Sequence, residues 1–225
     1  MNQKEIFLGK EGDCWYQRNN EKLAEVSRYE KNDRLVTDLL RLNMKFESIL
    51  EVGCSNGIRL EALRRNFAAK CHGIEPSPLA VTKGMASFPE LFLRTGTADE
   101  LPYDDHAFDL FIFGFCLYLC DRSDLFKIAS EADRVLKDKG ILAILDFHPP
   151  FAYRNDYVHF PGVYSYKMDY SRLFSWNPAY SIILSSVFAH QGNDVPGDPD
   201  ERVAVSLLRK DMGQGFPRNP FSFPR

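Results

Sequence analysis

The segment Ile49–Gly57 (ILEVGCSNG) has the residue types and the spacing of a ligand-binding turn. A short apolar run ends at Val52, and Gly53 and Gly57 then follow with the spacing G-x-x-x-G. Glycine has no Cβ, so the backbone can turn sharply there and a ligand can approach it closely. The helix expected after Gly57 offers unpaired N–H groups at its N-terminus to a polar ligand. The spacing differs from the G-x-G-x-x-G pattern of nicotinamide and flavin enzymes, which makes such a cofactor the weaker alternative.

Two further acidic residues follow expected strands. Glu75 comes directly after the apolar run Cys71–Ile74, and Asp99 comes shortly after Leu91–Arg94. A structural role is open to both residues, with Glu75 or Asp99 capping a nearby helix or turn. Glu51 has a similar alternative as a simple strand-end carboxylate.

Apolar runs alternate with amphipathic segments between residues 45 and 146. This alternation predicts βαβ units, and therefore a parallel sheet with helices on both faces. One or two amphipathic helices are also expected within residues 21–42, where Leu23 belongs to the apolar pattern. The helix Leu125–Leu136 is expected to stop near Lys139-Gly140. The expected strands are Ser48–Val52, Cys71–Ile74, Leu91–Arg94, Phe108–Phe113 and Ile141–Asp146, and the expected helices between them are Ile58–Phe67, Pro78–Ala86 and Leu125–Leu136.

The alternation stops after Asp146. Residues 147–180 hold 11 aromatic side chains, which suit either a pocket for a second substrate or an interface in a homodimer. Of these two, the pocket is preferred. Two β-like runs, Tyr180–Ala189 and Arg202–Arg209, then predict a hairpin with a long loop, and the Pro- and Gly-rich tail 211–225 is expected to be irregular.

Taken together, residues 45–148 resemble the class I S-adenosylmethionine-dependent methyltransferases. EVGCSNG is similar to the E/D-x-G-x-G-x-G turn of that family, with Ser55 in place of the middle glycine. By this resemblance Glu75, in HGIEPS, accepts hydrogen bonds from both ribose hydroxyls, and Asp99, in TADELP, receives the adenine amino group. Residues 107–113 and 114–118 resemble the fourth strand and the loop beneath the methionine portion.

The resemblance implies a Rossmann-like α/β fold, with a mostly parallel seven-stranded sheet, helices on both faces and a C-terminal antiparallel hairpin. It implies an enzyme that uses S-adenosylmethionine and releases S-adenosylhomocysteine, with no metal. The single domain would comprise an N-terminal helical cap or lid (1–44), a cofactor-binding core (45–146), an aromatic acceptor-binding insertion (147–180), a hairpin (181–210) and a tail (211–225). The expected cofactor-binding residues are Tyr16, Glu51, Gly53, Cys54, Ser55, Gly57, Glu75, Pro76, Ala98, Asp99, Phe113 and Tyr118.

A methyl acceptor that is a hydroxyl needs a base, whereas an unprotonated amine or a carboxylate does not. His148 is the first candidate base, because it follows the fifth strand at the carboxyl edge, where open α/β sheets bind ligands. His159 is the second candidate, and the alternative for His148 is a bond to loop backbone. His190 is a further histidine at a strand end, and the sequence does not orient it.

The preferred acceptor is a hydroxyl of a small molecule such as a sugar, a nucleotide-sugar or a secondary metabolite. The Asn/Asp-Pro-Pro-Tyr signature of nucleobase amine methylation is absent, since the loop contains Phe113-Gly114-Phe115-Cys116. The other hypotheses are an N-methyltransferase, a protein or peptide methyltransferase, a non-catalytic cofactor-binding module and a nicotinamide oxidoreductase.

The composition of the 225 residues narrows the class of protein. The net charge of −3 gives no sign of the broad basic surface of a nucleic-acid binder. No apolar run reaches the roughly 18 residues that span a bilayer, and the N-terminus lacks the apolar region of a secretion signal. The five cysteines are scattered and form no zinc motif, which suits free thiols. We therefore expect a cytoplasmic protein that binds neither nucleic acid nor membrane.

Overall fold

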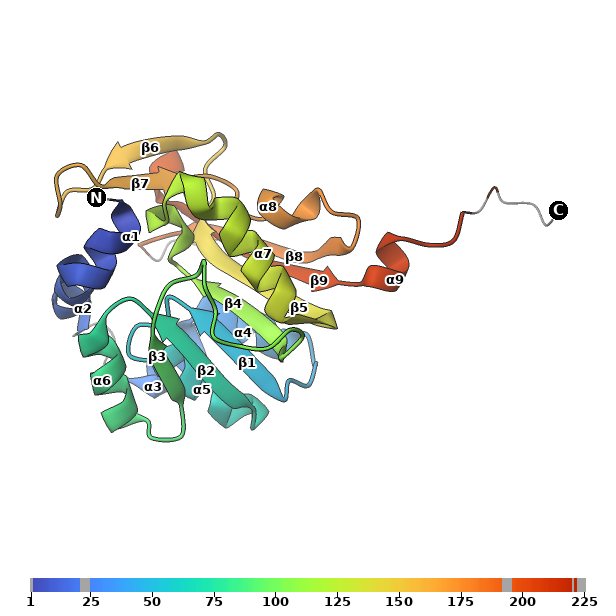
Figure 1. Cartoon of the computed structure of the whole chain (residues 1–225), viewed down its shortest axis with the longest axis horizontal. Helices are drawn as coiled ribbons and strands as arrows, with labels where there is room; N and C mark the ends of the chain where they lie inside the picture. Colours follow the sequence, from blue (N-terminus) through green and yellow to red (C-terminus); the bar gives the residue numbers. More distant parts are fainter. Residues whose placement is uncertain (1, 21–24, 192–195, 220, 222–225) are drawn as a thin grey trace.

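Seven strands form one sheet in the computed structural model, which describes residues 2–20, 25–191, 196–219 and 221. The first five strands in the sheet run parallel, and the last two are antiparallel to their neighbours (Figure 1). This confirms the expected Rossmann-like sheet with its C-terminal hairpin. In spatial order the strands are β3 (Phe92–Thr95), β2 (Lys70–Glu75), β1 (Ser48–Val52), β4 (Phe108–Gly114), β5 (Leu136–Phe147), β9 (Arg202–Lys210) and β8 (Tyr180–Ala189).

Helices cover both faces of the sheet because successive residues of a buried strand point to opposite sides. Along β1, Ile49 joins the apolar cluster under one set of helices, and Leu50 joins the cluster on the other face. The first cluster contains side chains of α4 (Arg34–Arg41), α5 (Ile58–Phe67) and α6 (Pro78–Ser87), whereas the second contains those of α7 (Leu125–Val135). Ahead of α4 lies the shorter α3 (Val26–Asn32), which packs against α5.

The carboxyl end of α7 differs from the expectation. The helix ends at Val135, not near Lys139-Gly140, and β5 begins directly at Leu136. Lys139 takes a left-handed conformation with φ of 66°, and the register between β4 and β5 shifts at this point. The residues expected to end the helix therefore form an irregular start of a strand.

Three short helical segments at the N-terminus run one after another across the carboxyl edge of the sheet: α1 (Gln3–Ile6), η1 (Phe7–Glu11) and α2 (Gly12–Asn19) (Figure 1). The aromatic segment forms a separate two-stranded sheet, β6 (Tyr153–Asp156) and β7 (Tyr164–Lys167), followed by the single turn α8 (Arg172–Ser175). The remaining short elements are η3 (Leu117–Leu119), η4 (Arg122–Asp124), η5 (Pro199–Glu201) and α9 (Met212–Gly215).

Some expectations lie outside the described residues. They are Leu23 in the amphipathic pattern, part of the loop between β8 and β9, and most of the last six residues of the tail. The described part of the tail contains the turn α9, although an irregular chain was expected. Among the described residues, no helix is both long and apolar enough to cross a membrane.

Candidate active site

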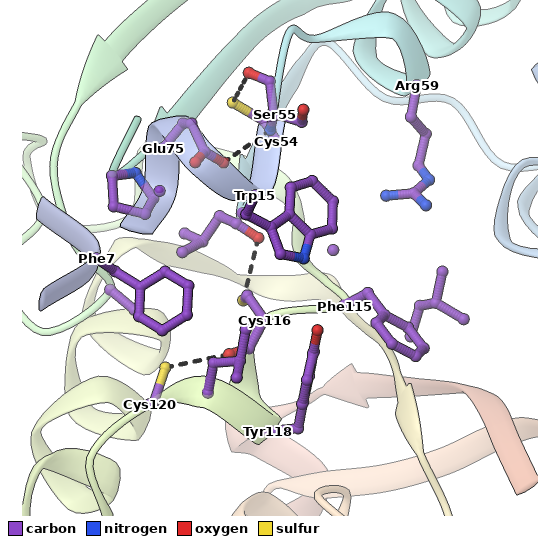
Figure 2. A pocket seen from close by; sticks show the side chains of 18 of the residues that line it. Phe7, Trp15, Cys54, Ser55, Arg59, Glu75, Phe115, Cys116, Tyr118 and Cys120 are labelled. Carbon is purple, nitrogen blue, oxygen red and sulfur yellow. Dashed lines mark hydrogen bonds between the residues drawn. The ribbon is translucent and has the colours of Figure 1, made fainter. Parts of the chain in front are cut away.

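A cavity of about 620 Å³ lies at the carboxyl edge of the sheet. The turn after β1 and the residues that follow β2, β3 and β4 form its floor. Side chains of the N-terminal segments, among them Lys4, Phe7 and Trp15, form another wall (Figure 2). This position is where open α/β sheets bind their ligands.

The turn between β1 and α5 takes backbone conformations that favour glycine. Gly53 and Gly57 have φ of 76° and 77°, and Ser55 between them has φ of 51°. A Cβ on Gly53 would lie 2.6 Å from Cys116 Cβ, so a larger residue has no room there. The Ser55 hydroxyl is buried and has no hydrogen-bond partner among the described residues. The turn therefore offers an unsatisfied polar group beside the cavity.

Glu75 ends β2 and contributes a buried carboxylate to the cavity. Its two oxygens accept hydrogen bonds from the backbone N–H groups of Ser55 at 2.9 Å and Ser77 at 3.1 Å. Burial raises the pKa of Glu75 to about 7, although these two N–H groups favour the ionised form. Each oxygen can still accept a bond from a ligand hydroxyl.

Asp99 lies after β3 and is paired with the N-terminal helix. The Lys4 ammonium lies 2.8 Å from the Asp99 carboxylate, Lys127 lies 3.4 Å from it, and the Thr97 hydroxyl donates to it at 2.8 Å. Burial opposes ionisation of Asp99, but the bonds from Lys4 and Thr97 outweigh it and lower the pKa to about 2. The acid expected to receive the adenine amino group thus already holds a cation from α1.

A second charged group lies at the β1–β4 side of the cavity. Arg59 in the first turn of α5 forms ion pairs with Glu51 of β1 and, at 3.0 Å, with Asp33. Burial raises the pKa of Glu51 in spite of the Arg59 charge. Arg59 and Asp33 line the cavity, and the sequence reasoning missed both. The one signal for Arg59 is its place two residues after Gly57.

Aromatic side chains enclose the other end of the cavity, opposite the end that presents Glu75 and Asp99. Phe115, Tyr118, Phe188 and His190 line it. The His190 ring stacks on Phe115 with ring centres 5.2 Å apart and planes 11° from parallel. Burial raises the pKa of the Tyr118 hydroxyl, so this phenol stays protonated.

Eight of the twelve expected cofactor residues line the cavity, and four do not. Glu51 is fully buried behind Arg59, and Phe113 lies in the core against Phe111. Gly57 packs beneath the turn, where a Cβ would lie 2.8 Å from Leu91. Tyr16 is absent from the wall, and its neighbour Trp15 lines the cavity in its place. The eight lining residues are Gly53, Cys54, Ser55, Glu75, Pro76, Ala98, Asp99 and Tyr118.

The two expected catalytic histidines, His148 and His159, are not among the residues that line the cavity. The backbone of His148 pairs with Arg202, and its Nε2 lies 3.7 Å from Asp169. His159 packs edge-on against Tyr157, with ring centres 5.3 Å apart. His190, which the sequence could not orient, is the histidine that lines the cavity.

The aromatic segment, residues 147–180, does not contribute side chains to this cavity. None of residues 147–180, all of which are described, lines the cavity. Instead Tyr157, Phe160 and Val163 pack against Ile6 and Phe7 of the N-terminal segments. The Gln3 side chain exchanges two hydrogen bonds with the Tyr164 backbone. Residues 157–164 thus hold the N-terminal helices in place over the cavity.

Comparison with known proteins agrees with this geometry. Residues 50–144 match the family model described as a methyltransferase domain. A protein of Synechocystis sp., named only as an uncharacterized methyltransferase, is 30% identical over 104 residues, which are 46% of this chain and 49% of that protein. The chain spans about half the length of the curated relatives that it matches.

Solved structures share the fold at low sequence identity. A SAM-dependent methyltransferase of Methanosarcina mazei superposes with a TM-score of 0.62 at 15% identity, covering 77% of this chain and 97% of that one. The complex between the Trm112 methyltransferase activator and a methyltransferase of Haloferax volcanii gives a TM-score of 0.64 at 17% identity, covering 90% of this chain and 98% of that one. At these identities the likeness concerns the fold alone.

The residues at the carboxyl edge fit S-adenosylmethionine. The left-handed turn at Gly53 leaves room for close approach, and Glu75 can accept from hydroxyls. The orphaned Ser55 hydroxyl is a buried polar group in the cavity wall that a polar ligand would satisfy. Together with the match of residues 50–144 to a methyltransferase domain and the sheet topology, these features make the core of the chain similar to that of the class I S-adenosylmethionine-dependent methyltransferases.

Proposed function

We propose that this protein transfers a methyl group from S-adenosylmethionine to a hydroxyl group of a small, flat molecule. The observation that carries the proposal is a single cavity with two unlike ends. One end presents the carboxylates Glu75 and Asp99 beside the Gly-rich turn, and the other presents aromatic rings and His190. A donor and an acceptor can therefore bind in one space with the reacting groups between them.

His190 is the side chain that suits the role of base. When bound, S-adenosylmethionine supplies a methyl group on a sulfonium, and the protein then has to orient the acceptor and take its proton. His190 Nδ1 lies 3.9 Å from Glu201 Oε2, an atom that is buried and has no hydrogen-bond partner in the described part of the chain. The backbone N–H of His190 donates a hydrogen bond to the backbone carbonyl of Glu201 at 2.8 Å, so the hairpin holds the two residues opposite each other. A carboxylate behind a histidine orients the ring and stabilises its charged form.

The shape of the site favours a small acceptor over a polypeptide. The N-terminal helices lie over the cavity, and Phe7 and Trp15 contribute to its wall. Aromatic faces and the Tyr118 hydroxyl suit a flat molecule that also forms polar contacts. An N-methyltransferase would need no base at His190, and a non-catalytic module would need no second end to the cavity.

The proposal is tested with S-adenosylmethionine that carries a labelled methyl group. The protein is incubated with panels of small phenols, sugars, amines and carboxylates, and separately with a mixture of unfolded polypeptides. We expect label in hydroxyl compounds and none in amines or polypeptides. Label only in amines, only in polypeptides or in no fraction would contradict the proposal. Calorimetric titration with S-adenosylhomocysteine and with NAD separates a failure of cofactor binding from a wrong acceptor class, because only the former abolishes the S-adenosylhomocysteine signal.

A further inference from the structure

The small sheet of β6 and β7 presents three polar side chains to one carboxylate outside the cavity. The Tyr153 hydroxyl donates to Asp200 Oδ1 at 2.6 Å, and the Asn155 amide donates to the same oxygen at 3.0 Å. The Lys167 ammonium also lies 2.8 Å from this oxygen. Tyr153 pairs directly with Lys167 across the two strands, and Asn155 lies two residues further along β6, so all three share one face of the sheet. Asp200 in η5 is thus where this face meets the loop of the β8–β9 hairpin.

Lys167 is a buried cation that three acceptors surround. Its side chain is only 7% exposed, and an ammonium has three N–H donors. Its Nζ donates to the backbone carbonyl of Asp200 at 2.8 Å, in addition to the ion pair with the Asp200 carboxylate. Nζ also lies 3.9 Å from the centre of the Phe147 ring. Because a buried charge that loses its partners is costly, Lys167 holds η5 by both the main chain and the side chain of Asp200.

Both contacts of Lys167 lead to the histidine of the acceptor end. Glu201 follows Asp200 in η5, and its backbone carbonyl accepts the backbone N–H of His190. The buried Glu201 Oε2 lies 3.9 Å from His190 Nδ1. The Phe147 ring packs against the His190 ring, with ring centres 5.7 Å apart. Lys167 therefore contacts the two features that flank the imidazole, which are the turn that carries Glu201 and the ring of Phe147.

The place of Glu201 determines which ring nitrogen of His190 carries the proton. A carboxylate on the Nδ1 side favours a proton on Nδ1 and leaves Nε2 unprotonated, whereas a neutral histidine without such a partner carries its proton mainly on Nε2. Only an unprotonated nitrogen can take the proton of an acceptor hydroxyl. The Glu201 side chain is 35% exposed, so water competes for its carboxylate. Its orientation toward His190 therefore depends on where η5 lies.

We propose that Lys167 and Asp200 are positioning residues for the base of the acceptor end. Through them the β6–β7 sheet holds η5 so that Glu201 faces Nδ1 of His190 and leaves Nε2 for the acceptor. The inference rests on the proposed role of His190 as base and adds the part of the chain that orients it. Neither Lys167 nor Asp200 lines the cavity, so both act through Glu201. The strands β6 and β7 thus hold the hairpin, while the loop 157–164 between them packs against the N-terminal segments.

The first test is nitrogen NMR of the ligand-free full chain, isotopically labelled in its histidine rings, at a pH where these rings are neutral. The signal of His190 is distinguished from those of the other histidines with the variant His190→Gln. We expect the proton of His190 on Nδ1 in the unaltered protein and mainly on Nε2 in Glu201→Ala. Lys167→Met and Asp200→Asn should both resemble Glu201→Ala, although Glu201 is intact in each.

The second test separates positioning from a direct effect of charge. Lys167→Met removes a positive charge and Asp200→Asn removes a negative one, so a direct electrostatic effect on His190 would have opposite signs in the two variants. Displacement of η5 acts in the same direction in both. With an acceptor from the labelled-methyl screen, we expect both variants to lower turnover by about 10- to 100-fold, and the KM for S-adenosylmethionine to stay within about twofold.

The matched control is Lys137→Met, which also removes a lysine that pairs with an aspartate. Lys137 lies 2.8 Å from Asp109, at the opposite end of the parallel strands from the cavity. This variant should keep both the Nδ1 proton of His190 and the turnover of the unaltered protein. A loss of either in Lys137→Met would contradict a specific role for the pair in η5.

The remaining outcomes also decide the proposal. A proton on Nε2 in the unaltered protein, a proton on Nδ1 in both Lys167→Met and Asp200→Asn, or opposite effects of these two variants on turnover would overturn it. If the NMR result is as expected and no hydroxyl compound is methylated, the orientation of His190 by η5 is confirmed and the proposed function is wrong. Should Asp200→Asn unfold because Lys167 is left without a counter-charge, the double variant Lys167→Met/Asp200→Asn removes both charges and should still carry the proton on Nε2.

Discussion

The two ends of the cavity are formed by different kinds of segment of the chain. At the cofactor end, the residues of the cavity floor lie within a few positions of the end of a parallel strand, as Glu75 ends β2 and Gly53 follows β1. At the acceptor end, His190 comes from a hairpin loop and Phe115 from the segment after β4, 75 positions earlier in the sequence. The first end is fixed by local strand–turn–helix geometry, and the second by the packing of distant segments.

This difference predicts which property of the protein a substitution at each end will change. The turn at Gly53 and Gly57 depends on left-handed backbone conformations that side chains strain. The acceptor end depends on where the β8–β9 hairpin places its loop. We therefore expect substitutions at the cofactor end to act on cofactor affinity, and those at the acceptor end to act on turnover and acceptor choice.

The largest effect is expected for His190→Gln, measured as turnover with an acceptor found in the labelled-methyl screen. Loss of a general base costs about 100- to 10,000-fold in rate, and S-adenosylhomocysteine affinity should stay within about twofold. His148→Gln is the matched control, because His148 lies outside the cavity at the end of β5. Equal turnover of the two variants would remove the distinction between His190 and His148.

Glu75→Ala should weaken S-adenosylhomocysteine binding by about 100-fold, since two hydrogen bonds from hydroxyls to a charged acceptor are lost. Calorimetry measures the change, and the exposed neighbour of Asp99 provides the control Glu100→Ala. At saturating cofactor, turnover of Glu75→Ala should be nearly normal. A reduced turnover with unchanged affinity would reverse the roles of the two ends.

Burial raises the pKa of two carboxyls to about 7, those of Glu75 in the cavity wall and of Asp146 behind the loop that carries Tyr118. Asp146 accepts backbone N–H groups of Leu117, Tyr118 and Phe147 and so holds the loop that carries Tyr118. In the unfolded chain both acids titrate near pH 4, so the folded state binds more protons in the interval between the two pKa values.

The stabilising effect of these two protonated acids is therefore complete below about pH 4 and is lost as the pH rises to about 7. As the pH rises over that interval, each acid should lower the free energy of unfolding by about 3 to 4 kcal/mol. Urea unfolding of the ligand-free protein between pH 5 and 8 measures the slope, and Glu75→Gln and Asp146→Asn should each flatten it. A slope that is unchanged in both variants would show that these acids ionise normally.

The smallest effect is expected at the ion pair that joins the N-terminal helix to the cofactor end. The Lys4 side chain is 31% exposed, so its pair with Asp99 contributes about 0.2 to 1 kcal/mol. Lys4→Met frees Asp99 for the cofactor and should tighten S-adenosylhomocysteine binding by about twofold to fivefold at low salt. The exposed Lys10→Met is the control. Weaker binding by Lys4→Met would mean that this helix helps to close the cavity over the cofactor.

The same difference explains how much of the molecule could be predicted from its sequence. The strand Ser48–Val52 and the helix Ile58–Phe67 were predicted with the bounds that the structure has, because an apolar run and a Gly-rich turn define them locally. The start of β5 at Leu136 was not predicted. Pairing with β4 determines where this strand begins, and the local helix-stop signal at Lys139-Gly140 does not.

At the site, local sequence located Glu75 and Asp99 in the cavity wall but misplaced residues that depend on helix phase or long-range packing. Trp15, not Tyr16, lines the cavity because α2 turns that side chain inward. In the sequence, Arg59 resembles an exposed residue of a surface helix. Only its ion pairs with Glu51 and Asp33 show that its side chain is largely buried. The aromatic residues 147–180 suggested a pocket by composition, whereas Tyr157 and Phe160 pack against the N-terminal helices and Tyr170 and Phe174 join the core under α7.

The central claim is that one cavity holds the methyl donor at one end and the acceptor at the other. A crystal structure with S-adenosylhomocysteine bound tests it most directly. We predict ribose hydroxyls at Glu75, adenine at Asp99, and the sulfur facing the space that Phe115, Tyr118 and His190 enclose. A ligand with its adenine among those aromatic rings, or bound outside this cavity, would contradict the account.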